Sequence, residues 1–236
     1  MTQVYHPLLI AICTLGRVRI EWAAAFTGQS APFGRGLNPF VIMGMTTIDA
    51  RNRAVEMARE KQAEYLMFWD DDVIPRDALC LERMMATIQV NKHVDVIGGV
   101  YPVRRDVPNP IVVKSADADG PFWDWRDGKA HKVHMVGTGF MVIRMASFDE
   151  VTEPFFAYDP TMSDDFYFAN VCKKHGKQQY IDGSVICDQI DLDSRLYRVE
   201  AAMGSEMAEE VAEVGLPPRK MFRAELMPGG LRVVKA

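Results

Sequence analysis

The sequence predicts an α/β protein with a mostly parallel central sheet flanked by helices. Largely apolar runs at residues 8–14, 65–69 and 94–100 are typical of buried parallel strands. Between them, the segments 46–64 and 78–90 carry apolar residues at helical spacing. Strands that alternate with helices in this way build a layered α/β domain.

The other elements follow from local signals such as turn residues, caps and helix breakers. They are helices over 20–26, 163–174 and 196–214, strands over 136–144, 179–181 and 184–187, and loops over 28–40, 101–110 and 153–162. We therefore expect a single domain over 1–195. A C-terminal helix and tail over 196–236 is expected to pack on this core or on a partner subunit.

Composition and charge argue against several classes of protein. The 236 residues include 32 acidic and 27 basic side chains, a net charge of −5, which lacks the basic footprint of a non-specific nucleic-acid binder. The four cysteines are scattered without a CxxC pair, which argues against a structural zinc site or a disulfide framework. No apolar run approaches the roughly 20 residues of a membrane span. We expect a cytoplasmic protein.

Three adjacent aspartates, Asp70, Asp71 and Asp72, follow the apolar run at 65–69. Ligands of open α/β sheets bind outside the carboxyl ends of the strands. Alternate residues of an extended segment point the same way, so Asp70 and Asp72 form a pair and Asp71 faces elsewhere. Such a pair suits Mg²⁺ or Mn²⁺ with bound phosphates. The structural alternative is an acidic turn that caps the next helix.

Arginines and glycines nearby allow two interpretations each. Arg51 or Arg53, on the helix before the aspartates, could pair with a phosphate or an aspartate, or could lie on a solvated helix face. Gly137 and Gly139, on either side of Thr138, indicate a bulge or the close approach of backbone or ligand, or close packing alone.

The acidic pair Asp164 and Asp165 follows Ser163 at the start of a predicted helix. Helix capping and the helix dipole explain this composition. The functional interpretation is that one carboxylate acts as a general base toward a hydroxyl group.

The order of these features resembles the GT-A-fold glycosyltransferases, in particular small bacterial and viral members related to family 2. The matching segments, spread over roughly Leu8 to Asp191, are LLIAICT, IDARNRAVEMA, YLMFWDDDVIP, VDVIGGVYPVRR, VGTGFMVIR, SDDFYFANVCKKHGK and QYIDGSVICDQI. The resemblance implies a GT-A, Rossmann-like fold. It also implies metal-dependent, inverting transfer of a sugar from a UDP- or GDP-sugar to a saccharide or other hydroxyl acceptor.

The resemblance also implies roles for individual residues. Asp70 and Asp72 would hold Mn²⁺ or Mg²⁺, and Gln189 stands where the family usually has a histidine ligand. Asp165 would be the base, beside Asp164. Residues implied on the nucleotide and sugar side are Thr14, Leu15, Arg17, Asp49, Arg51, Asn52, Asp71, Gly137, Thr138 and Gly139.

Three alternatives stay open. Gln189 in place of histidine fits a nucleotide-sugar-binding protein that has lost catalysis. Clustered carboxylates also fit a metal-dependent nucleotidyl or phosphoryl transferase, although no Gly-rich phosphate loop is present. The tail over 196–236 could instead form the interface of a homo-oligomer.

Overall fold

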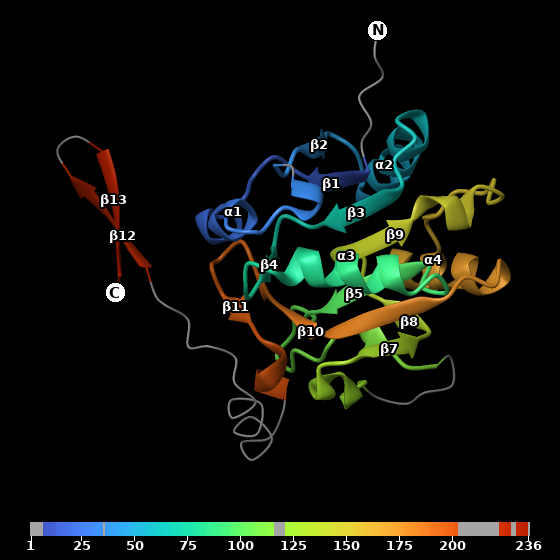
Figure 1. Ribbon diagram of the computed structural model, residues 1–236. Helices are drawn as coiled ribbons and strands as arrows, with labels where there is room; N and C mark the ends of the chain where they lie inside the picture. The colour runs from blue at the N-terminus through green and yellow to red at the C-terminus, as the bar shows by residue number, and fades with distance from the viewer. Residues whose placement is uncertain (1–6, 35, 116–120, 203–221, 228–229, 236) are drawn as a thin grey trace, which may run out of the picture. The chain divides into compact units, whose positions relative to one another are not determined.

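The structure is a computed structural model that describes residues 7–34, 36–115, 121–202, 222–227 and 230–235. The chain divides into two units, Met1–Ala202 and Met203–Ala236. In the second unit, strands β12 (Phe222–Met227) and β13 (Gly230–Lys235) form an antiparallel pair. The first unit holds the predicted sheet and its helices (Figure 1).

The central sheet has the strand order β11-β10-β5-β9-β3-β1-β2. Its strands are β1 (Leu8–Thr14), β2 (Pro39–Met43), β3 (Tyr65–Trp69), β5 (Val96–Val100), β9 (Phe140–Arg144), β10 (Gln179–Ile190) and β11 (Leu196–Tyr197). β1 runs parallel to β2 and β3, and β10 runs parallel to β5. β9 lies antiparallel between β3 and β5. The carboxyl ends of β1, β3, β5 and β10 therefore meet at one edge of the sheet.

Shorter strands extend this sheet. β4 (Val73–Pro75) and β7 (Ala130–Val133) both pair antiparallel with β10. β6 (Val112–Val113) and β8 (Met135–Val136) form a separate two-stranded sheet. The single turns of 3₁₀ helix are η1 (Pro32–Gly34), η2 (Asp124–Asp127), η3 (Met145–Phe148) and η4 (Val199–Ala202).

Helices cover both faces of the sheet because each buried strand carries apolar side chains on both sides. Leu9 and Ala11 of β1 share a cluster with Ala54 of α2 (Thr47–Glu60) and with apolar residues of α4 (Asp164–Lys174). Ile10 and Ile12 of the same strand belong to a second cluster, with residues of α1 (Ile20–Thr27) and α3 (Cys80–Val90). The result is a three-layer α/β arrangement, as predicted.

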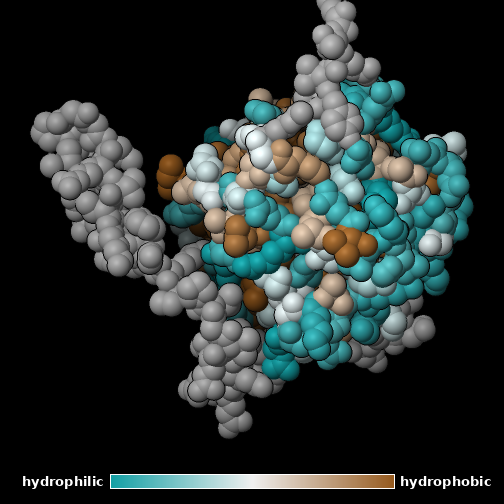
Figure 2. All heavy atoms as spheres, viewed as in Figure 1, coloured by the Kyte–Doolittle hydropathy of each residue, from teal (hydrophilic) through white to brown (hydrophobic). Residues whose placement is uncertain are grey.

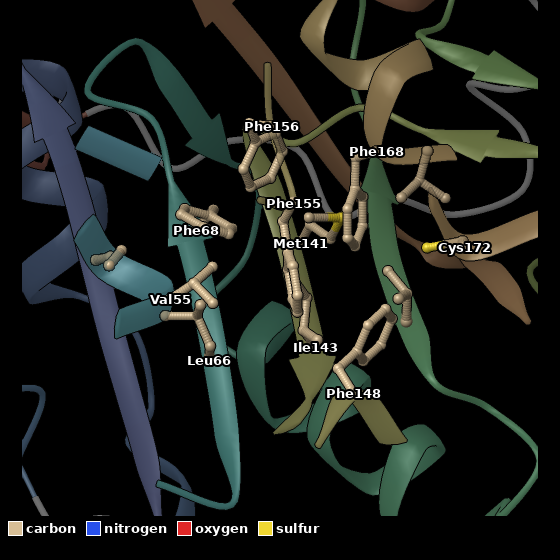
Figure 3. Packing of buried hydrophobic residues seen from close by; sticks show 14 of the residues in the cluster. Val55, Leu66, Phe68, Met141, Ile143, Phe148, Phe155, Phe156, Phe168 and Cys172 are labelled. Atoms are coloured by element: carbon tan, nitrogen blue, oxygen red, sulfur yellow. The ribbon is translucent and has the colours of Figure 1, made fainter. Parts of the chain in front are cut away.

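Aromatic rings fill the core on the side of α2 and α4 (Figure 3). Phe168 of α4 stacks on Phe155 and Phe156, with ring centroids 5.7 and 5.2 Å apart. Phe156 also meets Phe68 of β3 edge-on at 5.4 Å. This packing fixes the segment before α4 against the strand that carries the three aspartates.

The predicted elements differ from the structure at several places. The loop expected over 28–40 ends in strand β2, and residues 73–75 form strand β4. The two short strands expected near 179–187 are one continuous strand, β10. The helix predicted from Leu196 is wrong over its described part, where β11 and η4 lie, and residues 203–214 lie outside the described residues.

Large apolar side chains are also exposed, among them Leu15, Ile20 and Leu192 at 91%, 78% and 75%. On the face shown in Figure 2, brown apolar residues are scattered among teal polar ones. None of the described helices has the length and apolar character needed to cross a membrane.

The register of β10 against β5 shifts between Ile181 and Ile186. At Gly183 an added Cβ would lie 2.1 Å from the carbonyl oxygen of Trp125 and 2.9 Å from that of Lys129. Both contacts are with backbone atoms, which cannot rotate away. The absence of a side chain at this position therefore lets β10 pass the segment 125–129.

We predict that Gly183→Ala lowers the free energy of unfolding by about 1–3 kcal/mol or more, because the new methyl group overlaps fixed backbone. Urea denaturation measures this change. Gly36→Ala is the matched control, since a Cβ there meets no atom within 4 Å. Equal stability of the two variants would contradict the close approach at Gly183.

Candidate active site

A cavity of about 1020 Å³ lies at the carboxyl edge of the sheet. It is bounded by the loops that follow β1, β3 and β10 and by the first turn of α2. The residues that line it include Thr14, Leu15, Arg17, Asp70, Asp71, Asp72, Arg104 and Asp191. Ligands of α/β sheets bind at this edge, so the cavity is the first candidate for a functional site.

Asp70 and Asp71 are held in different ways. The carbonyl oxygen of Asp70 accepts a hydrogen bond from Trp22 Nε1 at 2.8 Å, and its backbone nitrogen donates to the carbonyl of Gly139 at 2.8 Å. The carboxylate of Asp71 accepts a hydrogen bond from the hydroxyl of Thr14, at the end of β1. Burial raises the pKa of Asp71 above its usual range.

Asp72 lies between Arg104 and Gln189. Its Oδ2 atom is 2.9 Å from Arg104 Nη1 and accepts a hydrogen bond from Gln189 Nε2 at 3.2 Å. Asp72 Oδ1 and Gln189 Oε1 are both buried and have no hydrogen-bond partner among the described residues. Burial and the carboxylate of Asp70 raise the pKa of Asp72 to about 6. Two buried acceptor oxygens on neighbouring side chains indicate a place that suits a cation.

Arg51 is a buried cation that joins two elements. Its side chain forms ion pairs with Asp164, in the first turn of α4, and with Asp70 Oδ2 at 3.0 Å. Burial lowers its pKa, but the carboxylates of Asp70, Asp164 and Asp165 outweigh that effect, and the net pKa is raised. Arg51 is therefore charged and serves as the counter-ion of the acidic groups around it. Arg53 instead pairs with Glu56 and Glu60 on the exposed face of α2.

Asp165 is oriented by Thr138. Its Oδ1 atom accepts hydrogen bonds from the backbone nitrogen and the hydroxyl of Thr138, at 2.9 and 2.7 Å. Burial raises the pKa of Asp165 above its usual range. Ser163 occupies the N-cap position of α4, as expected, but its side chain makes no capping hydrogen bond. The two carboxylates of the first turn bind Arg51 and Thr138.

The two glycines around Thr138 are explained by close packing. A Cβ at Gly137 would lie 2.3 Å from the hydroxyl of buried Tyr101, and one at Gly139 would lie 2.8 Å from it. The same hydroxyl accepts a hydrogen bond from Gly139 N at 2.7 Å. The glycines leave room for the Tyr101 ring beside the aspartates.

The structure brings some of the expected nucleotide-side residues to the cavity and not others. Thr14, Leu15, Arg17 and Asp71 line it together with Asp70 and Asp72. The others have structural partners. Asp49 accepts a hydrogen bond from Thr46 at the N-cap of α2, and Asn52 exchanges two hydrogen bonds with the backbone of Phe156. Arg51 lies beneath the aspartates, among its ion pairs.

Arg104 and Asp191 line the cavity although sequence reasoning assigned them no role. The expected loop over 101–110 gave no sign that Arg104 would reach Asp72. A signal for Arg51 did exist, because the apolar residues Ala54, Val55 and Ala58 stand three, four and seven positions after it. That spacing puts Arg51 on the buried face of its helix and Arg53 on the other face.

Among the described residues, no group of three or more His, Cys, Asp or Glu side chains is arranged to hold a metal ion alone. Any cation at Asp72 would therefore need oxygen atoms from the amide of Gln189 and from a ligand.

We predict that Arg51→Gln lowers the free energy of unfolding by about 3–5 kcal/mol, because it leaves the carboxylates of Asp70 and Asp164 without their buried counter-ion. Chemical denaturation at neutral pH measures the loss. Arg53→Gln removes the same charge from the exposed face of the same helix and should unfold close to wild type. If the two variants were equally stable, Arg51 would not carry this structural role.

Part of the chain matches a known protein family. Residues 46–152 match the family model described as glycosyl transferase family 2. The matched segment contains Arg51, the three aspartates and Arg104. In the comparison with curated protein sequences, nothing matches the chain.

Two solved structures share the fold. A197 from STIV aligns with a TM-score of 0.61 and 20% identity, over 81% of this chain and 93% of that one. GalNAc-T7, solved with UDP, GalNAc and Mn²⁺, aligns with a TM-score of 0.54 and 11% identity, over 89% of this chain and 48% of that one. This chain thus spans about half the length of the GalNAc-T7 chain. It has the GT-A fold and resembles the family-2 glycosyltransferases, and this similarity supports glycosyl transfer from a nucleotide sugar.

Proposed function

We propose that the chain transfers a sugar from a nucleoside diphosphate sugar to an acceptor hydroxyl, with the donor bound in the cavity at the carboxyl edge of the sheet. The observation that carries this proposal is the position of Asp70, Asp71 and Asp72 in the wall of that cavity, opposite the loop that follows β1. The family-2 match over 46–152 supports the reaction class. GalNAc-T7, of the same fold, was solved with UDP and Mn²⁺.

The residues around Asp72 fit a divalent cation. Asp72 Oδ1 and Gln189 Oε1 are buried acceptors without a partner among the described residues, and both are hard oxygen ligands of the kind that Mg²⁺ and Mn²⁺ accept. Mg²⁺ in particular is held by one or two carboxylates together with substrate phosphates. A bound cation would neutralise charge that develops on the leaving diphosphate. Asp70 is the second aspartate of the pair, and Arg51 already supplies it with a counter-charge.

Asp165 is the proposed base. Its Oδ1 atom is fixed by the two hydrogen bonds from Thr138, which orient the carboxylate. In the proposed step, the acceptor hydroxyl gives its proton to Asp165 while its oxygen forms a bond to the anomeric carbon. The bond from that carbon to the diphosphate oxygen breaks, and the nucleoside diphosphate leaves with the electron pair. Attack from the opposite face inverts the anomeric configuration.

The Arg51–Asp164 ion pair has a positioning role in this mechanism. It fixes the first turn of α4, and therefore Asp165, relative to Asp70 at the end of β3. The positive charge on Arg51 also stabilises the anionic form of Asp165 against the effect of burial. Asp165 can thus be ionised in a partly buried position.

A non-catalytic alternative has one observation in its favour. The arginines Arg51 and Arg104 already neutralise Asp70 and Asp72. A protein of this fold that binds a nucleotide sugar without transferring it would need no further cation. Binding of UDP or GDP without any transfer or hydrolysis of the sugar nucleotide would favour this alternative.

We predict that UDP or GDP raises the melting temperature in the presence of Mn²⁺ or Mg²⁺. A ligand at about 100 times its Kd adds about 2.7 kcal/mol, or about 5–10 °C for a chain of this size. Asp72→Asn should lose the metal-dependent part of the shift, measured by thermal unfolding. Asp193→Asn, an exposed change in the loop after β10, is the control and should keep it. No shift with either nucleotide would contradict the proposed function, and a metal-independent shift would remove the cation from it.

We predict that Asp165→Asn lowers kcat by about 10²–10⁴-fold, the range of general base catalysis. The melting shift with nucleotide should be unchanged, because the Asn oxygen can still accept the hydrogen bonds of Thr138. In wild type the base must be ionised, and its pKa is raised by burial. The rate should therefore fall with decreasing pH through a value above about 3.9, the ordinary pKa of Asp. Wild-type turnover in the variant would exclude Asp165 as the base.

A further inference from the structure

A second cavity, of about 540 Å³, shares Arg104 with the first. Its wall includes Arg105 and Asn109 from the loop after β5, and Arg195 and Tyr197 from the segment after β10. The mechanism proposed above uses none of these four residues. The wall holds three arginines and one carboxylate, Asp106, in a chain whose acidic residues outnumber the basic ones by 32 to 27.

The loop that presents Arg104 and Arg105 is closed on itself. Pro102 and Pro110 form an isolated antiparallel bridge, and Val103 N donates to the carbonyl of Asn109 at 2.8 Å. Proline fixes the φ angle and so limits the conformations of the chain. The two arginines therefore extend from a constrained backbone.

Arg195 faces the cavity from the other side. Its guanidinium carbon lies 4.9 Å from the centre of the Tyr197 ring. Asp191 fixes this segment, because its carboxylate accepts hydrogen bonds from Arg195 N at 2.9 Å and from the Tyr197 hydroxyl at 3.0 Å. A guanidinium that lies on an aromatic face still presents its N–H groups at the edge, where they can bind an oxyanion.

The positive charge of this wall is only partly neutralised. Arg105 has no ion pair with a carboxylate in the part of the chain that the structure describes. Arg195 lies 3.7 Å from Asp106, which is 99% exposed and therefore well screened by solvent. Arg104 pairs with Asp72, but its side chain is 47% exposed, so this pair is also open to exchange. An incoming anion would find N–H donors from three guanidinium groups.

We propose that the second cavity binds a phosphate group of the acceptor, with Arg105 and Arg195 as its main contacts and Arg104 between the two cavities. This inference rests on the proposed glycosyl transfer and names the chemical class of its acceptor. Several guanidinium groups can share the oxygens of one phosphate, whereas one arginine fork satisfies a carboxylate. The donor diphosphate is assigned to the first cavity, beside the three aspartates, which leaves the second cavity to the other substrate.

Binding of inorganic phosphate to the full chain tests this inference, followed by ³¹P NMR with and without saturating UDP and the diamagnetic cation Mg²⁺. The double variant Arg105→Gln/Arg195→Gln should bind phosphate at least tenfold more weakly than wild type. Lys132→Gln/Lys173→Gln makes the same charge change at two exposed positions outside both cavities and should bind as wild type does. The melting shift with UDP and Mn²⁺ should be the same in all three proteins.

Three other results would each contradict one part of the proposal. If wild type binds UDP but not phosphate, or if the control loses phosphate binding equally, the second cavity is not a phosphate site. If saturating UDP displaces the phosphate and the double variant also binds UDP more weakly, the arginines belong to the donor diphosphate and the acceptor assignment is wrong. If UDP does not bind wild type, the proposed glycosyl transfer fails, whatever phosphate does.

Discussion

The ion pairs of Arg51 are the interaction on which the candidate site depends. The side chain is buried, with 5% of the residue exposed, and a guanidinium in such a place loses its hydration at a cost of several kcal/mol. Asp70 and Asp164 replace the lost water, and they come from different elements, the end of β3 and the start of α4. The ion pairs that offset this cost therefore also fix the end of β3 and the start of α4 relative to each other.

Asp70 and Asp72 differ in how firmly their ion pairs hold them. Asp70 is tied to a buried cation, whereas Asp72 pairs with Arg104, whose side chain is 47% exposed. A solvent-exposed pair contributes little and exchanges readily. A divalent cation would therefore compete with Arg104 for Asp72, while the pair between Arg51 and Asp70 stays in place. Because Arg104 also lines the second cavity, its release would add positive charge where we propose that the acceptor phosphate binds.

The layered fold could be predicted from the sequence because a buried parallel strand is a short run of residues that is apolar on both faces. The run 65–69 placed three aspartates at a strand end, and the cavity lies there. Contacts between side chains from different strands have no such pattern in the sequence. Arg104 stands 32 positions after Asp72 in the chain, and its contact exists only because β3 and β5 end at the same edge.

The end of the first unit shows how tertiary contacts override local preference. The segment from Leu196 has a sequence compatible with a helix, yet Tyr197 pairs with Gln189 of β10 and Val199 is fully buried. Glu200 binds Arg76, which also holds the buried carboxylate of Asp188. None of these partners is close in sequence, so periodicity within the segment could not reveal them.

The alternation of β10 gives a physical reason why glutamine can stand at position 189. Neighbouring residues of a strand point to opposite sides, so Asp188 meets Arg76 while Gln189 meets Asp72. Asp188 is thus committed to a buried ion pair and cannot turn toward the cavity without breaking it. Gln189 donates to Asp72 from its amide nitrogen and also holds a buried amide oxygen, where histidine would offer a nitrogen. Such an amide oxygen suits a hard cation and lacks the preference of imidazole for softer transition metals. If a cation binds beside Asp72 as proposed, glutamine at position 189 favours a hard ion such as Mg²⁺.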